Sequence, residues 1–350
     1  MKTTGAVQTA VNEPLVIAEL DTPDPRPDKV IVKLFATGVC HSQLHQMHSP
    51  DLPRPLVLGH EATGIVTHLG RDVAHVKEGD NVIVNWVSRV PSKGRRPFTP
   101  PGTTYRGEPI NDALVYTWAR DVLVGGEYVI SMSKESPTDV TAIVGCAVLT
   151  GAGAVMNTAK VRPGDSVAVF GVGGVGLSAV QTASLLEASP IIAVDLQDDK
   201  LDFAREFGAT HTINASQADP VEQIIEMTDG GVDYAFDTIG VRATTEQVLP
   251  VTRGGGPGAD NHGGMAVLVG IPGEEMTLDP RLFTFHQRRF RGSLGATYPE
   301  RDFPLFLRWH EEGKFPLDKL VTRRYKLEQI NEAYDALAAG EIFGRAIIEF

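Results

Sequence analysis

Residues 171–176 read Gly-Val-Gly-Gly-Val-Gly, a G-x-G-x-x-G pattern between a short apolar run, residues 166–170, and a segment that favours a helix. Glycines at these spacings let the backbone turn tightly and approach a phosphate, and the following helix N-terminus attracts its negative charge. The pattern therefore predicts the first strand–turn–helix of a nucleotide-binding parallel sheet, against the alternative of an ordinary glycine turn.

An acidic residue, Asp195, ends the next apolar run, residues 190–195. A carboxylate there accepts hydrogen bonds from the adenosine ribose and repels a 2′-phosphate. No arginine follows it directly, so the sequence favours NAD over NADP as the cofactor. The dinucleotide-binding residues expected in this half of the chain are Gly171, Gly173, Gly174, Val175, Gly176, Asp195 and Val269.

The rest of the chain divides into two parts with different patterns of expected secondary structure. Strand-like and helix-like segments alternate from residue 165 onward, which predicts a parallel, doubly wound sheet. The first half is rich in short strands, and the last segment carries a helical pattern and a final strand, residues 345–350. We expect an α/β protein with a Rossmann domain, 148–296, inserted into a β-rich domain formed by 1–147 and 297–350.

Composition narrows the possible partners. The 350 residues carry 32 Lys and Arg against 44 Asp and Glu, a formal charge of −12, which argues against nucleic acid or an anionic membrane as partner. The first 13 residues do not have the pattern of a signal peptide, and the apolar runs are strand-sized. Two cysteines in so long a chain do not indicate a disulfide framework, so we expect a cytoplasmic protein.

The two cysteines have a second possible role. Cys40, His60 and Cys146 offer two thiolates and one imidazole, which leaves one position of a tetrahedral zinc open, as in a catalytic site. The competing interpretation is that both cysteines are small buried hydrophobes.

Several motifs together resemble the zinc-dependent alcohol dehydrogenases of the medium-chain dehydrogenase/reductase superfamily. They occur in the family's order and comprise residues 38–42, 59–64, 76–80, 145–151, 172–176 and 344–345. Residues 145–237 especially resemble the branch with aryl-alcohol and glutathione-dependent formaldehyde enzymes. The resemblance implies a GroES-like catalytic domain, one catalytic zinc, NAD, and reversible oxidation of an alcohol to an aldehyde or ketone.

The resemblance also assigns roles to individual residues. Cys40, His60 and Cys146 match the zinc ligands, Ser42 the hydroxyl that bonds the substrate oxygen, and His45 the end of a proton relay. Trp86 matches an aromatic side chain of the substrate pocket, and Thr150 a contact near the nicotinamide. The remaining cofactor contacts implied are Asp195 and Lys200 on the ribose, with His41 and Arg345 on the pyrophosphate.

The sequence departs from the family in several places. Residues 87–117 contain no cysteine, so we expect one zinc per chain and no structural zinc. Gln43 stands where many members have an aspartate that orients the zinc-bound histidine. Glu61 either acts near the metal or pairs with a nearby cation. We expect residues 89–112, including the basic stretch 93–96, to form a surface excursion, and 253–264 a flexible loop.

Other readings of the same motifs remain open. The enzymatic alternatives are a polyol or sugar-type zinc dehydrogenase and a nicotinoprotein that retains its cofactor. The non-enzymatic alternative is a crystallin-like nucleotide-binding protein, although such a protein needs no proton relay. The expected partners are a small-molecule alcohol or aldehyde and, by family analogy, further copies of the chain in a homodimer or homotetramer.

Overall fold

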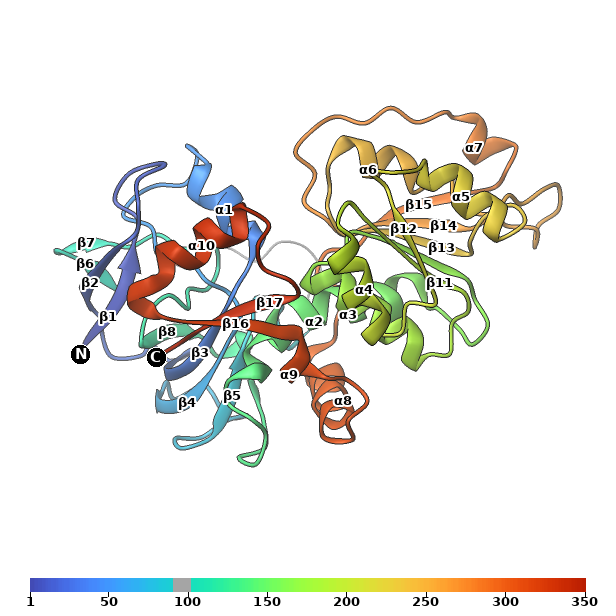
Figure 1. Ribbon diagram of the computed structural model, residues 1–350. Coiled ribbons are helices and arrows are strands. Elements are labelled where there is room, and N and C mark those ends of the chain that lie inside the picture. Colours follow the sequence, from blue (N-terminus) through green and yellow to red (C-terminus); the bar gives the residue numbers. More distant parts are fainter. Residues whose placement is uncertain (91–101) are drawn as a thin grey trace. The chain divides into compact units, whose positions relative to one another are not determined.

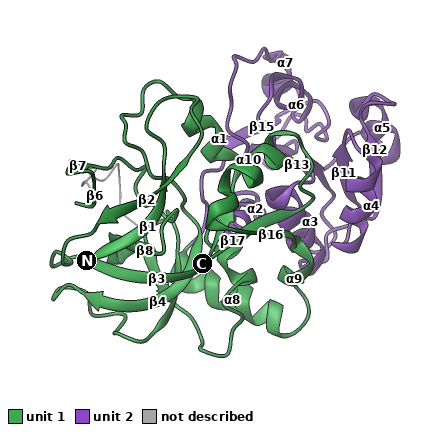
Figure 2. Ribbon diagram, turned by 60° about the vertical axis from the view of Figure 1, so that its left-hand side comes forward, with its two compact units in different colours: residues 1–146, 298–350 green, residues 147–297 purple. Residues whose placement is uncertain are grey.

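The computed structural model describes residues 1–90 and 102–350, and the chain divides into two compact units. Unit 1 comprises Met1–Cys146 and Tyr298–Phe350, and unit 2 is the continuous segment Ala147–Thr297 (Figure 2). The boundaries expected from the sequence lie one residue from these. One unit is thus inserted into the other along the chain.

Unit 2 is built on a six-stranded sheet in which every neighbouring pair is parallel. The strands are β10 (Val167–Phe170), β11 (Ile191–Asp195), β12 (His211–Asn214), β13 (Tyr234–Asp237), β14 (Met265–Leu268) and β15 (Arg289–Gly292). Their order is β12-β11-β10-β13-β14-β15, so the winding direction reverses at β10. That reversal is the topology of dinucleotide-binding sheets, and the predicted Rossmann fold is confirmed.

Helices connect these strands (Figure 1). The connecting helices are α3 (Gly174–Leu185), α4 (Asp198–Glu206), α5 (Pro220–Met227), α6 (Arg242–Gln247) and α7 (Arg281–Thr284). Before the first strand, β10, lies α2 (Ala147–Gly153), continued by a π-helical stretch (Ala154–Ala159). All four residues of β10 and most of α3 are buried, which explains why neither shows a polar face in the sequence.

Unit 1 contains a seven-stranded sheet around the long strand β3 (Lys29–Val39). Its other strands are β4 (Ala62–Leu69), β5 (Asn81–Val84), β8 (Asp121–Gly125), β9 (Val129–Ser131), β16 (Val321–Lys326) and β17 (Arg345–Glu349). The C-terminal strand β17 pairs antiparallel with β3, with Ala346 opposite Val39. This pairing brings Arg345 close to the end of β3, where Cys40 follows.

Smaller elements complete unit 1. A second sheet has the order β1-β2-β6-β7, formed by β1 (Lys2–Val7), β2 (Val16–Asp21), β6 (Thr104–Tyr105) and β7 (Glu108–Pro109). The helices are α1 (His41–His48), α8 (Pro299–Glu311), α9 (Leu317–Leu320) and α10 (Ile330–Ala338), with short 3-10 turns at Gly126–Tyr128, Val140–Gly145 and Leu327–Gln329. The β-rich domain expected from the sequence, formed by both ends of the chain, is confirmed by this arrangement.

The expected surface excursion over residues 89–112 is only partly right for its second part: residues 106–109 are exposed, but the residues on either side of them are anchored in the fold. Thr103 and Ile110 are buried, and Thr104 pairs with Asp21 to extend the second sheet. The Thr103 hydroxyl also hydrogen-bonds the buried Tyr116 hydroxyl at 2.8 Å. Tertiary pairing therefore orders a segment that has no hydrophobic periodicity of its own. The basic stretch 93–96 lies outside the described residues.

Residues 253–264 contain no helix or strand. The Gly255 amide donates to the His286 carbonyl at 2.7 Å, and the Arg253 guanidinium donates to the His262 carbonyl at 2.9 Å. The segment is therefore a loop that is tied down at both ends. Among the described residues, none of the helices has the length and apolar character needed to cross a membrane.

Candidate functional site

Cys40 lies at the junction of β3 and α1 in unit 1. Its backbone is still extended, with φ −118° and ψ 140°, so the chain turns into the helix directly after it. Gln43, in the first turn of α1, reaches back so that its Oε1 accepts a hydrogen bond from the Cys40 amide at 3.0 Å. This cap holds the helix start and fixes the position of the thiol.

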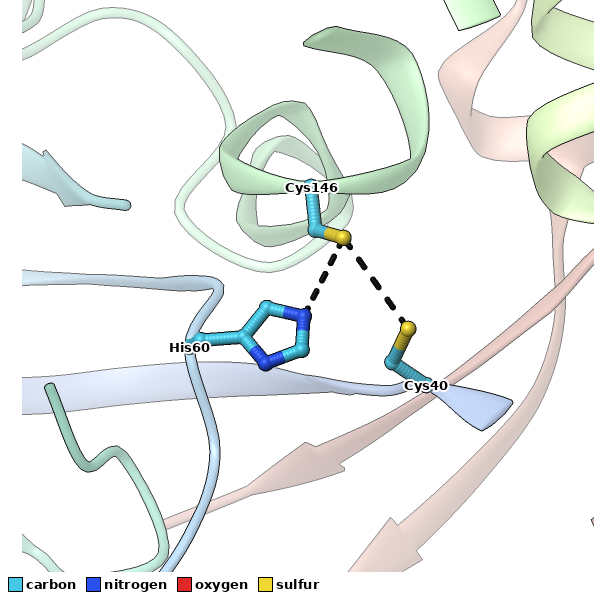
Figure 3. A group of neighbouring side chains, drawn as sticks. All are labelled: Cys40, His60 and Cys146. Atoms are coloured by element: carbon cyan, nitrogen blue, oxygen red, sulfur yellow. Dashed lines mark hydrogen bonds between the residues drawn. The ribbon is translucent and has the colours of Figure 1, made fainter. Parts of the chain in front are cut away.

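The structure brings Cys40, His60 and Cys146 together from three parts of unit 1 (Figure 3). The two Sγ atoms lie 3.9 Å apart, and His60 Nε2 lies 3.1 Å from Cys146 Sγ. Two sulfurs at about 2.3 Å from a tetrahedral zinc stand about 3.8 Å from each other. The spacing and the chemistry of the donors therefore fit a zinc ion.

The electrostatics of the two thiols favour charge on one of them. The hydrogen bond from Cys146, against the opposing effect of burial, lowers the pKa of the Cys40 thiol well below its ordinary value, and the positive charge of Arg345 adds to this. The same contact raises the pKa of Cys146 well above its ordinary value. Cys40 is therefore the more acidic of the two thiols, and a bound cation would supply the stabilisation that a second thiolate needs.

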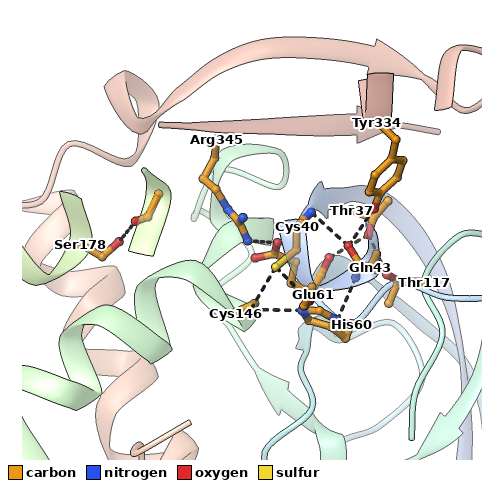
Figure 4. Close-up of polar contacts among 12 residues, drawn as sticks. Thr37, Cys40, Gln43, His60, Glu61, Thr117, Cys146, Ser178, Tyr334 and Arg345 are labelled. Atoms are coloured by element: carbon orange, nitrogen blue, oxygen red, sulfur yellow. Dashed lines mark hydrogen bonds and ion pairs between the residues drawn. The ribbon is translucent and has the colours of Figure 1, made fainter. Parts of the chain in front are cut away.

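Gln43 also contacts the third ligand candidate. Its amide nitrogen lies 2.8 Å from His60 Nδ1, and its Oε1 accepts a second hydrogen bond, 2.7 Å long, from the hydroxyl of Tyr334 (Figure 4). Tyr334 belongs to α10 and is buried. The role of orienting His60 therefore falls to an amide that is itself fixed by a residue from the C-terminal segment.

Behind the thiols, Glu61 forms an ion pair with Arg345, and both side chains are buried (Figure 4). Gly38 allows this, because a Cβ at that position would collide with the Glu61 carboxyl group. Burial opposes the charge of Arg345, but Glu61 and the two thiols raise the pKa of the guanidinium above its ordinary value. Of the two possibilities for Glu61, pairing with a cation is the one observed. A contact of Arg345 with a pyrophosphate stays a prediction.

The other expected residues of this half lie on or near α1. The Ser42 hydroxyl donates to Cys40 Sγ at 3.2 Å. The exposed rings of His41 and His45 stand 5.4 Å apart and line a surface cavity of about 340 Å³ together with His48. Desolvation and the neighbouring His45 lower the pKa of His41. Trp86, half-buried, meets the His60 ring edge-on at 6.4 Å.

In unit 2 the glycine-rich loop has the conformation that its sequence requires. Gly171 adopts φ +87°, and a Cβ at Gly176 would collide with the Gly171 carbonyl. The helix α3 begins at Gly174, so its free amides point toward the loop. This is the cradle expected for a pyrophosphate.

Asp195 ends β11 beside that loop, and its Oδ2 accepts a hydrogen bond from the Val172 amide at 3.0 Å. Lys200 lies in the following helix α4, Val269 directly after β14, and Thr150 in α2, where its hydroxyl has no hydrogen-bond partner within the described part of the chain. The ribose and nicotinamide roles of these residues stay predictions.

One site residue has no signal in the local sequence. Tyr334 stands 291 residues after Gln43, in a helix whose buried face the sequence does reveal. The sequence pattern does not distinguish a tyrosine that only packs in the core from one whose hydroxyl also hydrogen-bonds Gln43, the residue in contact with His60.

Comparison with known proteins agrees with this geometry. Residues 26–107 match the alcohol dehydrogenase GroES-like domain, and residues 174–312 match the zinc-binding dehydrogenase domain. The chain is 33% identical over 377 residues to the S-(hydroxymethyl)glutathione dehydrogenase of Escherichia coli O157:H7, with both proteins covered fully.

Solved structures give the same result. An alcohol dehydrogenase zinc-binding domain protein from Burkholderia ambifaria superimposes with a TM-score of 0.90 at 32% identity, over 100% of this chain and 99% of the other. Benzyl alcohol dehydrogenase from Acinetobacter calcoaceticus gives 0.88 at 29% identity, with the same coverage.

A Rossmann unit inserted into a GroES-like unit that carries a Cys₂His cluster defines a zinc-dependent oxidoreductase that acts on CH–OH groups. The chain belongs to the zinc-dependent alcohol dehydrogenase family.

Proposed function

We propose that this alcohol dehydrogenase oxidises its alcohol reversibly to an aldehyde or ketone with NAD as the hydride acceptor. The observation that carries the proposal is the group of Cys40, His60 and Cys146, to which no further Cys, His, Asp or Glu of the described residues adds a ligand atom. Three protein ligands leave the fourth position of a zinc for a substrate oxygen, whereas a structural zinc takes four.

The residues of α1 would handle the proton. A zinc ion held by the cluster supplies the Lewis acidity that makes a substrate hydroxyl easier to deprotonate. The Ser42 hydroxyl lies beside Cys40 Sγ and would accept the proton, which would then pass through a ribose hydroxyl of the bound cofactor to His45, whose ring is exposed, and on to solvent. A bound nicotinamide would supply the hydride acceptor, so the overall reaction would convert an alcohol and NAD⁺ into a carbonyl compound, NADH and one proton.

We assign NAD as the cofactor because of Asp195. Its carboxylate already accepts hydrogen bonds from the backbone amides of Val172 and Leu196, so it is held in place for ribose hydroxyls. A 2′-phosphate at the same place would bring two negative charges together.

We infer a primary alcohol with an aromatic group as the substrate class. The half-buried Trp86 ring stands against His60, which provides an aromatic wall next to the reaction centre. The name of the Acinetobacter neighbour supports this choice, whereas the name of the Escherichia coli relative supports a hydroxymethyl adduct of glutathione.

Steady-state kinetics with free NAD test this function. The panel contains benzyl alcohol, ethanol, sorbitol and S-(hydroxymethyl)glutathione, and we expect the highest kcat/KM for benzyl alcohol. Highest activity on sorbitol would favour a polyol dehydrogenase. Turnover that needs no added NAD, with an absorbing cofactor in the protein, would identify a nicotinoprotein. Absence of turnover with a bound nucleotide would favour the non-enzymatic, crystallin-like role.

We also propose a homodimer or homotetramer in the cytoplasm. Strand β15 ends the sheet of unit 2, and the neighbouring Phe285 and Leu294 expose 69% and 83% of their surface. An uncovered sheet edge with exposed apolar side chains suits pairing with a second copy. Both cysteines are free thiols, which suits a reducing compartment. Sedimentation at micromolar concentration tests the assembly, and a monomer there would contradict it.

A further inference from the structure

The buried amide of Gln43 has three partners, and one of them fixes which way the amide faces. The Cys40 backbone N–H can only donate, so the amide atom 3.0 Å from it is the oxygen, Oε1. The Tyr334 hydroxyl donates to the same oxygen at 2.7 Å. The amide nitrogen therefore faces His60 Nδ1, at 2.8 Å.

This orientation determines where the His60 ring carries its proton. An amide NH₂ group only donates, so Nδ1 must accept, and the neutral imidazole then has its proton on Nε2. Nε2 lies 3.1 Å from Cys146 Sγ, which is a suitable acceptor. The network is complete, but the ring nitrogen that faces the thiols carries a proton where a metal would bind.

Metal binding through Nε2 moves the ring proton to Nδ1. Two donors, the Nδ1–H and the Gln43 NH₂, then face each other at the distance of a hydrogen bond. A half-turn of the amide removes this conflict by presenting Oε1 to His60. The Tyr334 hydroxyl tolerates the turn because it can accept as well as donate, whereas the buried Cys40 N–H loses its acceptor.

We propose that Gln43 is a positioning residue that lowers the affinity of the metal centre for its ion. The Tyr334 hydroxyl limits this loss of affinity, because it can accept a hydrogen bond from the turned amide. A buried donor without a partner makes the loaded state less favourable, on the order of tenfold or more in affinity. A carboxylate would have no such conflict: one oxygen could serve Cys40 and Tyr334 while the other accepted from His60. The proposal rests on the metal centre of the proposed function and not on its substrate or nucleotide.

The experiment measures the release of zinc from the full-length protein to an excess of a chromogenic chelator. We expect Gln43→Glu to release zinc about tenfold more slowly than the wild type, or slower still. Tyr334→Phe leaves the turned amide NH₂ without a partner and should speed release. The same substitution in the Gln43→Glu background should have a much smaller effect, because a carboxylate needs no turn.

Two controls separate this role from a general loss of packing. Tyr116→Phe removes another buried tyrosine hydroxyl of unit 1, bonded to Thr103 and to the Leu123 amide, and should leave the release rate unchanged. The visible absorption of cobalt-loaded protein should keep its thiolate bands in every variant, which shows that the ligand set is the same.

The outcomes distinguish the inference from the function beneath it. Gln43→Glu protein that releases zinc as fast as the wild type, or faster, with unchanged cobalt bands, would overturn the inference alone. So would an equal effect of Tyr334→Phe in both backgrounds. A wild-type chain that binds neither zinc nor cobalt would overturn the metal centre and the inference together.

Discussion

Glu61 and Arg345 stand 284 residues apart in the chain and form an ion pair in which both side chains are buried. The arginine comes from the first residue of β17, and the glutamate follows the ligand candidate His60 directly. The pair therefore ties the C-terminal strand to the metal centre and keeps a positive charge next to two thiols.

We expect Arg345→Met to be strongly destabilising. It leaves the Glu61 carboxylate buried without its main counter-charge, and breaking such pairs costs about 3–5 kcal/mol. Urea unfolding of the zinc-loaded protein measures this, with Arg323→Met, in an exposed pair with Glu341, as the control. An Arg345→Met protein as stable as the control would show that the pair contributes nothing.

Asp112 should make stability depend on pH. Burial raises the pKa of this carboxyl group to about 6 in the folded chain, from an ordinary value of 3.8. The folded state thus holds the proton more tightly than the unfolded state, so the stability contributed by neutral Asp112 is present at pH 4 and is lost as the pH rises to 6.

The variant Asp112→Asn stays neutral and serves as the reference. Relative to the wild type, its free energy of unfolding should rise by up to about 3 kcal/mol between pH 4 and pH 7. Urea unfolding at pH 4.5, 5.5 and 7 measures this difference. A constant difference across that range would mean that Asp112 ionises normally.

Asp195→Gly should narrow the preference for NAD over NADP. The substitution removes the acceptor for the ribose hydroxyls and the repulsion of a 2′-phosphate, and we expect about a 10- to 100-fold change in the ratio of kcat/KM values. Asp198→Gly, at the first residue of α4, is the matched control. Equal kcat/KM values of the wild type with NAD and NADP would contradict the assignment of NAD as the cofactor.

Ser42→Ala should lower kcat by about 100-fold or more, because the first acceptor of the substrate proton is lost. Zinc content should stay close to that of the wild type, since the hydroxyl is not one of the three ligand groups. Ser133→Ala, at an exposed turn, is the control. Unchanged kcat in Ser42→Ala would exclude the relay.

Local sequence patterns predict much of this protein and fail at identifiable places. The final strand, predicted over residues 345–350, is observed at Arg345–Glu349, because its run of apolar residues acts within a few positions. The edge strand β15, with the sequence Arg-Phe-Arg-Gly, is mostly exposed and has no apolar run to reveal it. The hairpin of β6 and β7 likewise depends on pairing with β2, which only the fold supplies.

The site shows the same division. The residue types at Cys40, His60 and Cys146 predict a metal centre because thiolates and imidazole have few other uses in combination. Their hydrogen-bond partners are not predictable in this way. The glutamine at position 43 differs from the aspartate of many family members, and this difference is visible in the sequence. Its hydrogen bond with Tyr334 and the ion pair of Glu61 with Arg345 are not visible there, because each joins residues from distant parts of the chain within unit 1.

Metal analysis of freshly purified, untagged protein tests the central claim most directly. The described residues hold one group of metal-ligand type, and residues 87–117 contain neither Cys nor His, so only the carboxylates of Glu108 and Asp112 remain there, too few for a second, four-ligand site. We predict close to one zinc per chain in the wild type and close to none in Cys146→Ala. A value near two in the wild type, or an undiminished zinc content in Cys146→Ala, would contradict the account.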